Sequence, residues 1–367
     1  MVSIAISNLF HQKSKSILSI SGVILSVFLV FTIYGVYNGM DYIMESMTYK
    51  TGADLWITQQ GTSGSVHSPS FIPVDIGDQL SEYDEIEEFT PIIRTALTYK
   101  VGSTDILIFI NGYNTSGNLG NPWKVIEGKI NPGEKEIIID QTFSKISGLI
   151  IGDNISIQSS TFRIVGISDE GNIMVGYLAF LSYDDAKNLV PPNLTNGFIM
   201  KLKDGINSDE FSKKIQEDIP EINVQNSFSI AQAYKKEVLG GFIPIIFVLS
   251  AFSLFIGILI NGLLIYMLTL EKSKEYGIIK AMGASNFKLY RIVLSQALII
   301  SVIGYVIGSI LSFPLTSLIQ EIVPEFYVKI STEMLIGGFP IFVMTGIIAS
   351  LIPVSRLIGI DPAEVFK

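Results

Sequence analysis

The sequence predicts a membrane protein in which four transmembrane α-helices carry a large α+β extracytoplasmic domain, inserted between the first two helices. Of its 367 residues, 48% are hydrophobic and only 16% are charged, which is outside the range of ordinary soluble domains. Long apolar runs lie near both ends of the chain, whereas the stretch between the first two runs is polar and acidic. Apolar runs of about 20 residues or more can cross a bilayer as helices.

The first apolar run follows a short polar segment. Residues 1–15 mix apolar and polar side chains and end with basic residues, whereas residues 16–40 contain no charged residue. This run of 25 residues is too long for the core of a cleavable signal peptide, which has about 7–15 residues. Residues 16–40 are therefore predicted to form a retained first transmembrane helix with a cytoplasmic N-terminus.

Residues 41–237 consist of short runs rich in β-branched and aromatic residues, separated by Gly, Pro, Asn and Asp. This pattern predicts a mixed α+β domain. Elements before about residue 114 are repeated after about residue 196, which indicates one subdomain closed around a β-rich insertion. Strands are expected at residues 53–59, 92–101, 105–111, 136–140, 154–158, 162–167, 197–203 and 222–227, and helices near 76–83, 142–147, 183–190 and 208–218.

Three further apolar runs follow this domain. The first of them is uncharged for 33 residues, more than one span needs, and the excess is expected to continue outward as a stalk. The predicted order is a second helix at residues 238–270, a loop at 271–291, a third helix at 292–320, an external connector at 321–333, a fourth helix at 334–355 and a C-terminal tail at 356–367.

The distribution of charge indicates which side of the membrane each part occupies. Residues 39–239 contain 15 basic and 27 acidic residues, a net charge of −12, and the rest of the chain contains 10 basic and 7 acidic residues, a net charge of +3. The loop at 271–291 has five basic residues against two acidic ones. Because Lys and Arg are retained on the cytoplasmic face, the loop and the tail are predicted to be cytoplasmic and the acidic domain extracytoplasmic. The acidic balance also argues against nucleic acid as a partner.

Within the loop, residues 275–284 are predicted to form a short amphipathic helix. It should end at Gly283, because glycine readily adopts the left-handed conformation that terminates helices. Tyr276, Ile279 and either Met282 or Gly283 would share one side of this helix. A helix too short to cross the bilayer is suited to contact with a partner.

Residues 271–285, EKSKEYGIIKAMGAS, resemble the cytoplasmic coupling segment of the FtsX-like, MacB-type ABC transporter permease family, the type VII class of MacB, LolCDE and FtsX. Tyr276 stands where an aliphatic residue is usual, and EKSK replaces the usual arginine-containing lead. The N-terminus resembles the family's opening, in which an interfacial amphipathic helix, here residues 1–15, precedes the first span. The end of the chain resembles the family's closing motif, in which Val365-Phe366 replaces the usual pair and the matching residues are Asp361, Pro362, Ala363 and Glu364.

This resemblance implies a permease subunit of an ABC transporter in the prokaryotic cytoplasmic membrane, with both termini cytoplasmic. It implies a homodimer working with two copies of an ATPase subunit, and extrusion of a hydrophobic or amphipathic substrate by mechanotransmission through porter-like and β-rich external subdomains. An extracytoplasmic adaptor protein is a further candidate partner. The residues implied to couple to the ATPase are Glu275, Tyr276, Gly277, Ile278, Lys280, Ala281, Met282, Gly283 and Ala284.

The chain's own residues predict no catalytic site and no bound cofactor or metal. No G-x-x-x-x-G-K-[ST] phosphate-binding loop is present, so ATP and Mg²⁺ are expected on the partner subunit. There is no cysteine, and the two histidines, His11 and His67, are predicted on opposite sides of the membrane. The acidic run at residues 82–88 lacks the ligand spacing of a calcium loop, which favours a solvated turn. Gly304 and Gly308 are spaced for close helix packing, within the chain or at a dimer seam.

Two other functions are compatible with the same coupling loop. An FtsX-like regulator would use it to control an extracytoplasmic hydrolase and would transport nothing. A lipoprotein-releasing permease would act on a lipidated client. The external domain is larger than that of the minimal FtsX type, which favours transport.

Overall fold

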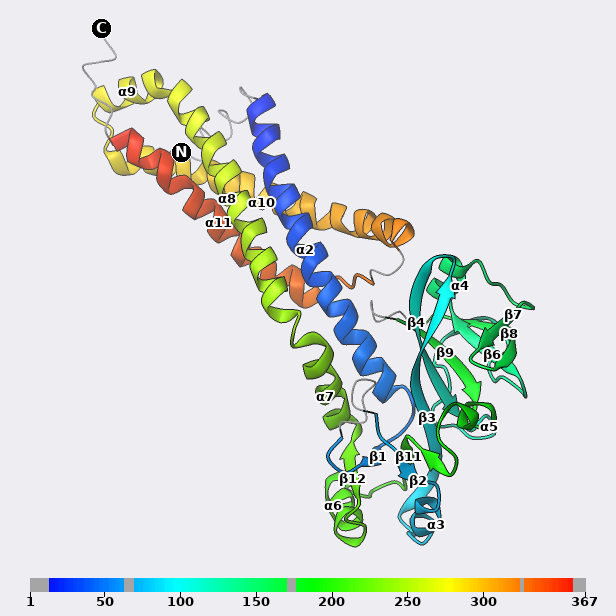
Figure 1. The fold of residues 1–367 in the computed structure, drawn as a ribbon. Helices are drawn as coiled ribbons and strands as arrows, with labels where there is room; N and C mark the ends of the chain where they lie inside the picture. The colour runs from blue at the N-terminus through cyan, green and yellow to red at the C-terminus, as the bar shows by residue number, and fades with distance from the viewer. Residues whose placement is uncertain (1–12, 63–68, 170–175, 324–326, 359–367) are drawn as a thin grey trace. The chain divides into compact units, whose positions relative to one another are not determined.

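The computed structural model describes residues 13–62, 69–169, 176–323 and 327–358 (Figure 1). The chain forms two compact units. The helical unit contains the chain up to Asn38, residues 242–322 and the chain from Val328 onward, and the sheet unit contains residues 39–241 and 323–327. The predicted fold class is confirmed, since a mixed α/β domain is inserted after the first of the long apolar helices.

Four helices in the described part of the chain are long and apolar enough to cross a membrane. They are α2 (Lys13–Tyr49), α8 (Ile243–Glu271), α10 (Asn286–Ile322) and α11 (Thr332–Ile358), and the short α9 (Ser273–Ala281) lies between α8 and α10. Residues 1–12, which hold most of the expected N-terminal helix, lie outside the described residues, as does the tail from residue 359.

The uncharged run at residues 238–270 is not one continuous helix. It contains the boundary between two helices, which the absence of charged residues does not indicate. Helix α7 (Ser227–Leu239) ends before Gly240, and α8 begins at Ile243 with a proline in its first turn. Proline is accepted there because the first N–H groups of a helix have no intrahelical acceptor. The residues expected to form the stalk lie in α7, which belongs to the sheet unit.

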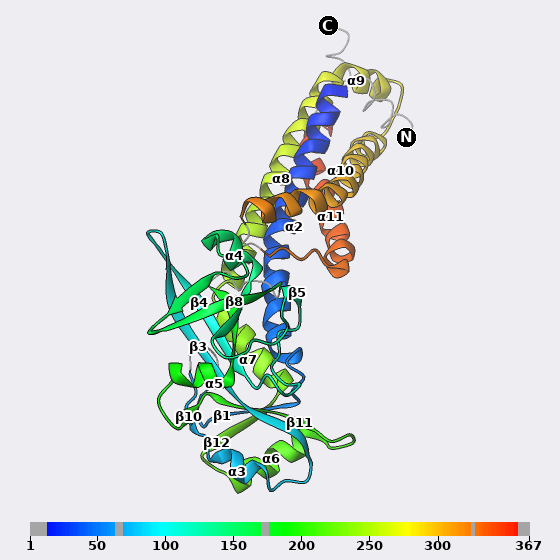
Figure 2. The ribbon, with the colours of Figure 1, turned by 90° about the vertical axis from the view of Figure 1, so that its right-hand side faces the viewer.

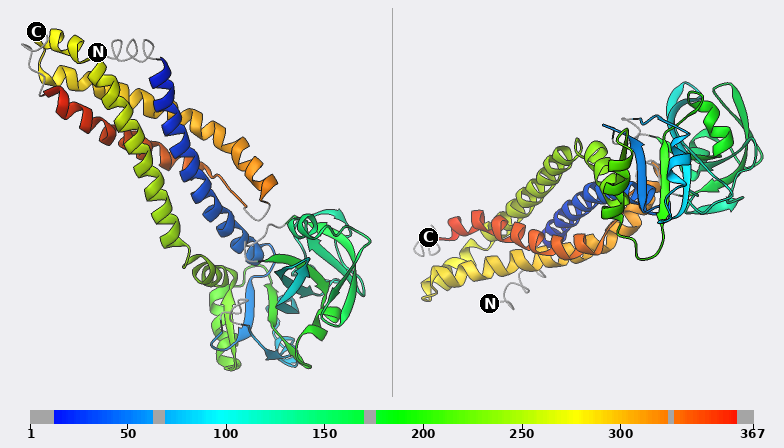
Figure 3. Two further views of the ribbon diagram at one scale, coloured as in Figure 1. Left: turned by 45° about the horizontal axis from the view of Figure 1, so that its top comes forward. Right: turned by 90° about the horizontal axis from the view of Figure 1, so that it is seen from below.

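The helical unit buries a cluster of aromatic and aliphatic side chains. The ring of Tyr305 on α10 lies edge-on to Phe31 of α2, with ring centroids 6.0 Å apart, and 5.6 Å from the ring of Phe342 on α11. The Tyr305 hydroxyl donates a hydrogen bond to the carbonyl of Leu335. Figure 3 shows α11 running alongside α10 and α8, with which it packs.

The sheet unit is built on one ten-stranded sheet with strand order β12-β1-β11-β3-β4-β9-β6-β8-β5, in which β7 also pairs with β8. Its strands are β1 (Leu55–Gln59), β3 (Ile86–Val101), β4 (Thr104–Tyr113), β5 (Val125–Gly128), β6 (Glu136–Asp140), β7 (Asn154–Ile157), β8 (Ser160–Ser168), β9 (Tyr177–Ser182), β11 (Gly197–Leu202) and β12 (Ile222–Asn226). The short β2 (Ile72–Pro73) and β10 (Leu194–Thr195) form a separate pair.

Strand β3 joins the two halves of this sheet. Its residues 86–92 pair with β11, and its residues 93–101 pair with β4. Helices α3 (Ile76–Leu80) and α6 (Ser208–Asp218) lie at the half formed by β1, β11 and β12 (Figure 2). The β-rich insertion contains α4 (Gln141–Ser147), followed by α5 (Tyr183–Ala186) and the 3₁₀ turn η1 (Lys187–Leu189). Strands β1 and β3, which precede the β-rich insertion in the chain, thus pair with β11 and β12, which follow it.

Alternate residues of the strands pack on opposite faces of the sheet. Ile57 and Phe198 belong to a core with α3 and α6, whereas their neighbours Trp56 and Ile199 belong to a different core. This second core extends across both halves of the sheet and includes residues from the last turns of α2 and from α7. One face of the sheet thus packs against the ends of the two helices that connect it to the rest of the chain.

Candidate functional site

The candidate coupling site is α9, a nine-residue helix between α8 and α10. It begins where the N–H of Tyr276 donates to the carbonyl of Lys272 at 2.9 Å. The ammonium of Lys272 also lies 2.9 Å from the carboxylate of Glu275, which is exposed. An acidic side chain in the first turn interacts favourably with the positive end of the helix dipole.

The C-terminal end of α9 has the hydrogen bonds of a Schellman motif. The N–H of Gly283 donates to the carbonyl of Lys280 at 3.0 Å, and the N–H of Ala284 donates to that of Ile279 at 3.2 Å. Gly283 has a φ of +91°, in the region that favours glycine. The predicted short helix is present, but it spans Ser273–Ala281 instead of residues 275–284, and Gly283 follows its C-cap residue Met282.

The two sides of α9 differ in exposure. Tyr276 is only 2% exposed and belongs to the core of the helical unit, against which Ile279 also packs. Gly277 is buried beside Tyr276, whereas Ala281 and Gly283 are exposed. Met282 is 75% exposed and Gly283 is exposed as well, so the prediction that one of them shares the buried side with Tyr276 is wrong. The reason is that Met282 is the C-cap residue and lies beyond the last regular turn.

The exposed side of α9 continues into the start of α10 and presents apolar side chains among cations. Ile278 is 46% exposed, and Phe287 on α10 is 66% exposed. We call Ile278, Met282 and Phe287 the apolar surface of the loop. The exposed basic residues in the same segment are Lys274, Lys288 and Arg291. Large exposed apolar side chains rimmed by charge are typical of contact surfaces.

The other predicted site residues lie elsewhere. Gly304 and Gly308 face α2 of the same chain, where a Cβ on either glycine would lie 2.6 Å and 2.9 Å from the Cβ atoms of Val23 and Val27, respectively. The two glycines therefore allow α10 to pack closely on α2. Ala284 is half-buried at the end of the Schellman motif. The closing motif, Asp361, Pro362, Ala363 and Glu364, lies outside the described residues.

The acidic run at residues 82–88 is engaged with lysines and backbone. Glu85 lies 2.6 Å from Lys214, and the hydrogen bond between them lowers the pKa of the Glu85 carboxyl. Glu87 lies 3.1 Å from Lys201. Burial and a hydrogen bond to Asp218 raise the pKa of the neighbouring Tyr83 to about 12. Among the residues that the structure describes, no group of three or more His, Cys, Asp or Glu could hold a metal ion.

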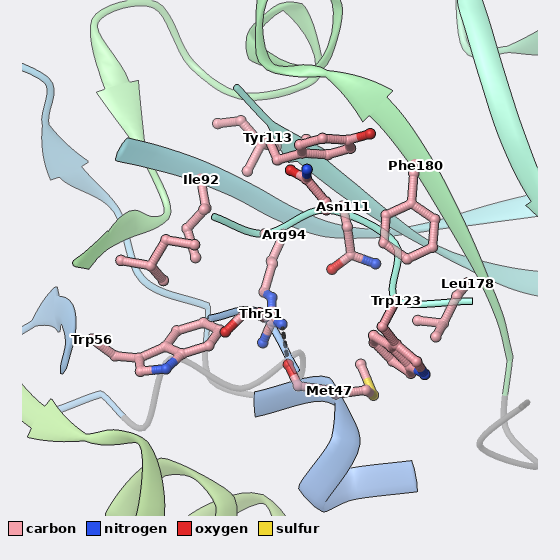
Figure 4. Close-up of a pocket in the computed structure, with 15 residues that line it drawn as sticks. Met47, Thr51, Trp56, Ile92, Arg94, Asn111, Tyr113, Trp123, Leu178 and Phe180 are labelled. Carbon is pink, nitrogen blue, oxygen red and sulfur yellow. Dashed lines mark hydrogen bonds between the residues drawn. The ribbon is translucent and has the colours of Figure 1, made fainter. Parts of the chain in front are cut away.

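A polar cluster that was not predicted from the sequence lies inside the sheet unit, around Arg94 of β3 (Figure 4). Its guanidinium contacts residues from three elements beside a cavity of about 20 Å³, lined in part by Trp56, Trp123 and Phe180. A cavity of this volume has room for a water molecule. The sequence contained one indication of this cluster, because Arg94 is the only charged residue in the apolar run IIRTAL. Burying a charged side chain is costly unless it has polar partners, so such a residue predicts a polar cluster around it.

The chain matches the models of two protein families. Residues 16–218 match the family described as MacB-like periplasmic core domain, and residues 247–362 match the family described as FtsX-like permease C-terminal. An uncharacterized ABC transporter permease of Mycobacterium tuberculosis is 23% identical over 100% of this chain and 99% of its own length. The macrolide export ATP-binding/permease protein MacB of Salmonella paratyphi A is 19% identical over 96% of this chain, which spans 58% of MacB.

Among solved structures, the periplasmic region of MacB from Actinobacillus actinomycetemcomitans has 16% identity and a TM-score of 0.39, covering 50% of this chain and 94% of that one. The family matches span both units, since the first covers α2 and most of the sheet unit and the second covers α8 to α11. The chain therefore belongs to the MacB-like, FtsX-like family of ABC transporter permeases and is a multi-pass membrane subunit of that class.

Proposed function

We propose that this permease couples ATP hydrolysis by a separate ATPase subunit to extrusion of a hydrophobic or amphipathic substrate, with α9 as the contact that receives the force. The observation that carries the proposal is that one side of α9 is buried and the other side is exposed. Tyr276 is fixed in the core of the helical unit, while Ile278 and Met282 remain open to a partner.

A rigid α9 is suited to transmit motion. The Schellman bonds fix its C-terminal end, and Tyr276 belongs to the same buried cluster as Ile265 of α8 and Ile292 of α10. Displacement of the exposed side therefore acts on both flanking helices, because packed cores move as bodies rather than deform continuously.

Extrusion by mechanotransmission fits the composition of the spans. Residues 16–40, 238–270, 292–320 and 334–355 contain no Asp, Glu, Lys or Arg, so they offer no charged pathway through the membrane. Helix α2 continues into the sheet unit, and α7 leads from that unit into α8. Rigid-body movement of these helices would drive the sheet unit and the substrate on the outer side.

In this proposal two permease chains form a homodimer in a prokaryotic cytoplasmic membrane and bind two ATPase subunits, which hold ATP and Mg²⁺. An ATPase partner is supported by the Mycobacterium tuberculosis relative, which is named an ABC transporter permease. The termini and α9 face the cytoplasm, and the sheet unit faces outward, where an adaptor protein could join it.

The docking role is tested by co-purification of the permease with its cognate ATPase. Met282→Asp should abolish recovery of the ATPase, because a carboxylate in an apolar contact is costly to desolvate. Ile150→Asp in the sheet unit is the matched control, since Ile150 is 64% exposed and distant in sequence from α9. Equal recovery of the ATPase with wild type and Met282→Asp would reject α9 as the contact.

Sidedness is tested by thiol labelling in intact cells, for which the chain is well suited because it has no cysteine. A cysteine at position 150 should react with an impermeant maleimide, and one at position 280 should react only after lysis. Reaction of both in intact cells would overturn the topology. ATPase stimulation of the purified complex by lipids, peptides, haem and macrolides would then identify the substrate class.

A further inference from the structure

The end of α2, helix α7 and strand β3 meet at one side chain. Arg94 lies on β3 directly after the point where pairing passes from β11 to β4, which is between Ile92 and Ile93. Its backbone N–H donates to the side-chain oxygen of Asn196 at 2.9 Å. Figure 4 shows its guanidinium directed toward Met47, at the end of α2.

The guanidinium completes the C-terminal end of α2. The last four carbonyls of a helix lack intrahelical donors. In α2 three of them are bonded locally, and the carbonyl of Met47 accepts from Nη2 of Arg94 at 2.9 Å. A cation at this end also interacts favourably with the helix dipole.

The same guanidinium binds α7 and rests on β1. Its Nη1 donates to the hydroxyl of Tyr234 on α7 at 3.0 Å. Its central carbon lies 4.5 Å from the ring centroid of Trp56 on β1, within the range of a cation–π contact. No Asp or Glu lies within 4.0 Å of Arg94 in the described chain. Replacing Arg94 therefore leaves no buried carboxylate without its counter-ion.

A second cation, Lys235, also connects α7 to α2. The ammonium of Lys235 on α7 lies 2.9 Å from Asp41 and 2.6 Å from Glu45, one turn apart on α2. Lys235 joins α2 only to α7. Arg94 joins both helices to the sheet.

We propose that Arg94 is the positioning residue through which α2 and α7 move the extracytoplasmic sheet as one body. The proposal rests on the proposed function, because the force must first reach these helices from the ATPase. With Arg94 in place, the helix ends and β3 shift together. Without it, the helices slide against the apolar face of the sheet, and the sheet follows their motion poorly.

The test uses the full permease with its ATPase in nanodiscs and one spin label per chain at Ile150→Cys. Pulsed electron-spin measurements give the distance between the labels of the two protomers, without nucleotide and with ATP and vanadate. Wild type should show a nucleotide-driven change in this distance. In Arg94→Met the change should be lost, whereas it should persist in Lys100→Met, which removes an exposed cation from the same strand.

Tyr234→Phe is the milder variant, because it removes only the hydroxyl that links Arg94 to α7. It should reduce the nucleotide-driven change in distance, and it provides the test if Arg94→Met does not fold. A residue that only stabilises the fold would lower the melting temperature and leave the nucleotide-driven change intact. A full change in both Arg94→Met and Tyr234→Phe would overturn the role of Arg94. No change in wild type would instead overturn the proposed force transmission itself.

Discussion

The carbonyl oxygen of Tyr327 occupies the space that a side chain on Gly39 would need. A Cβ at Gly39 would lie 1.9 Å from that oxygen, and the ring of Tyr327 stacks on Tyr42 with centroids 6.3 Å apart. The segment that precedes α11 thus docks on α2 through a position that only glycine can fill.

Gly39→Ala should therefore destabilise the protein although alanine favours helices. Displacing backbone to relieve an overpacked contact costs about 1–3 kcal/mol, more than the gain in helix propensity of about 1 kcal/mol. The melting temperature of the full chain in nanodiscs measures the effect. Gly337→Ala on α11 is the control, because a Cβ there meets nothing within 4 Å, and it should leave the melting temperature unchanged or higher. Equal melting temperatures for Gly39→Ala and wild type would contradict this.

Lys235→Gln should weaken the contact between α2 and α7. Hydrogen bonds between charged groups contribute about 1.5–3 kcal/mol each, and Lys235 has two carboxylate partners. Burial lowers the pKa of Lys235, but its hydrogen bonds with Glu45 and Asp41 outweigh this, so the net pKa is raised. The stabilisation is then complete at neutral pH, below the unfolded pKa of about 10.4, and is lost as the pH rises through the folded value.

The free energy of unfolding of the full chain at pH 7.5 and pH 10.5 checks this prediction. Lys235→Arg should retain stability, and Lys213→Gln, at an exposed position of α6, should change nothing. A Lys235→Gln protein as stable as wild type at pH 7.5 would show that the two carboxylates need no cation there.

Asp140 should make stability fall with rising pH. Its side chain caps α4 by accepting the N–H of Thr142 at 2.7 Å, but burial raises the pKa of its carboxyl from 3.8 to about 6. Because the folded state binds the proton more tightly, this group lowers the free energy of unfolding as the pH rises from about 4 to 6, by about 3 kcal/mol in all.

Asp140→Asn removes this dependence and keeps a good capping residue. The variant should melt above wild type at pH 7.5, and the difference should shrink at pH 4.5. Asp105→Asn, at an exposed position of β4, serves as the control for loss of one negative charge. A constant difference between Asp140→Asn and wild type at both pH values would refute the raised pKa.

Gly283→Val should uncouple ATP hydrolysis from transport. A β-branched residue is strained at a φ of +91°, so the Schellman end of α9 would open and Met282 would lose its position. Asparagine tolerates this backbone region, so Gly283→Asn should restore much of the coupling. Glu275→Gln, which removes the ion pair with Lys272, should reduce coupling more weakly.

The ratio of substrate extruded to ATP hydrolysed by the reconstituted complex gives the result for each variant, with the melting temperature as the test of folding. Full coupling in Gly283→Val would show that the shape of this helix end does not matter.

Much of the architecture follows from the sequence alone, because it depends on local patterns. The four spans follow from uncharged runs that are long enough to cross a bilayer as helices. The end of α9 follows from Gly283, because the backbone there adopts a conformation that favours glycine. Strand β9 was not predicted because its residues from Tyr177 to Leu181 are all buried, so its sequence lacks the alternation of a half-exposed strand.

Only the tertiary structure decided how distant residues meet. Met47, Arg94 and Tyr234 are far apart in the chain, and their hydrogen bonds exist because β3 brings both halves of the sheet to the ends of α2 and α7. The burial of Tyr276 likewise depends on residues of α2, α8 and α10, which form the core of the helical unit around it. Periodicity and charge act over neighbouring residues, whereas these contacts depend on which surfaces the whole chain buries together.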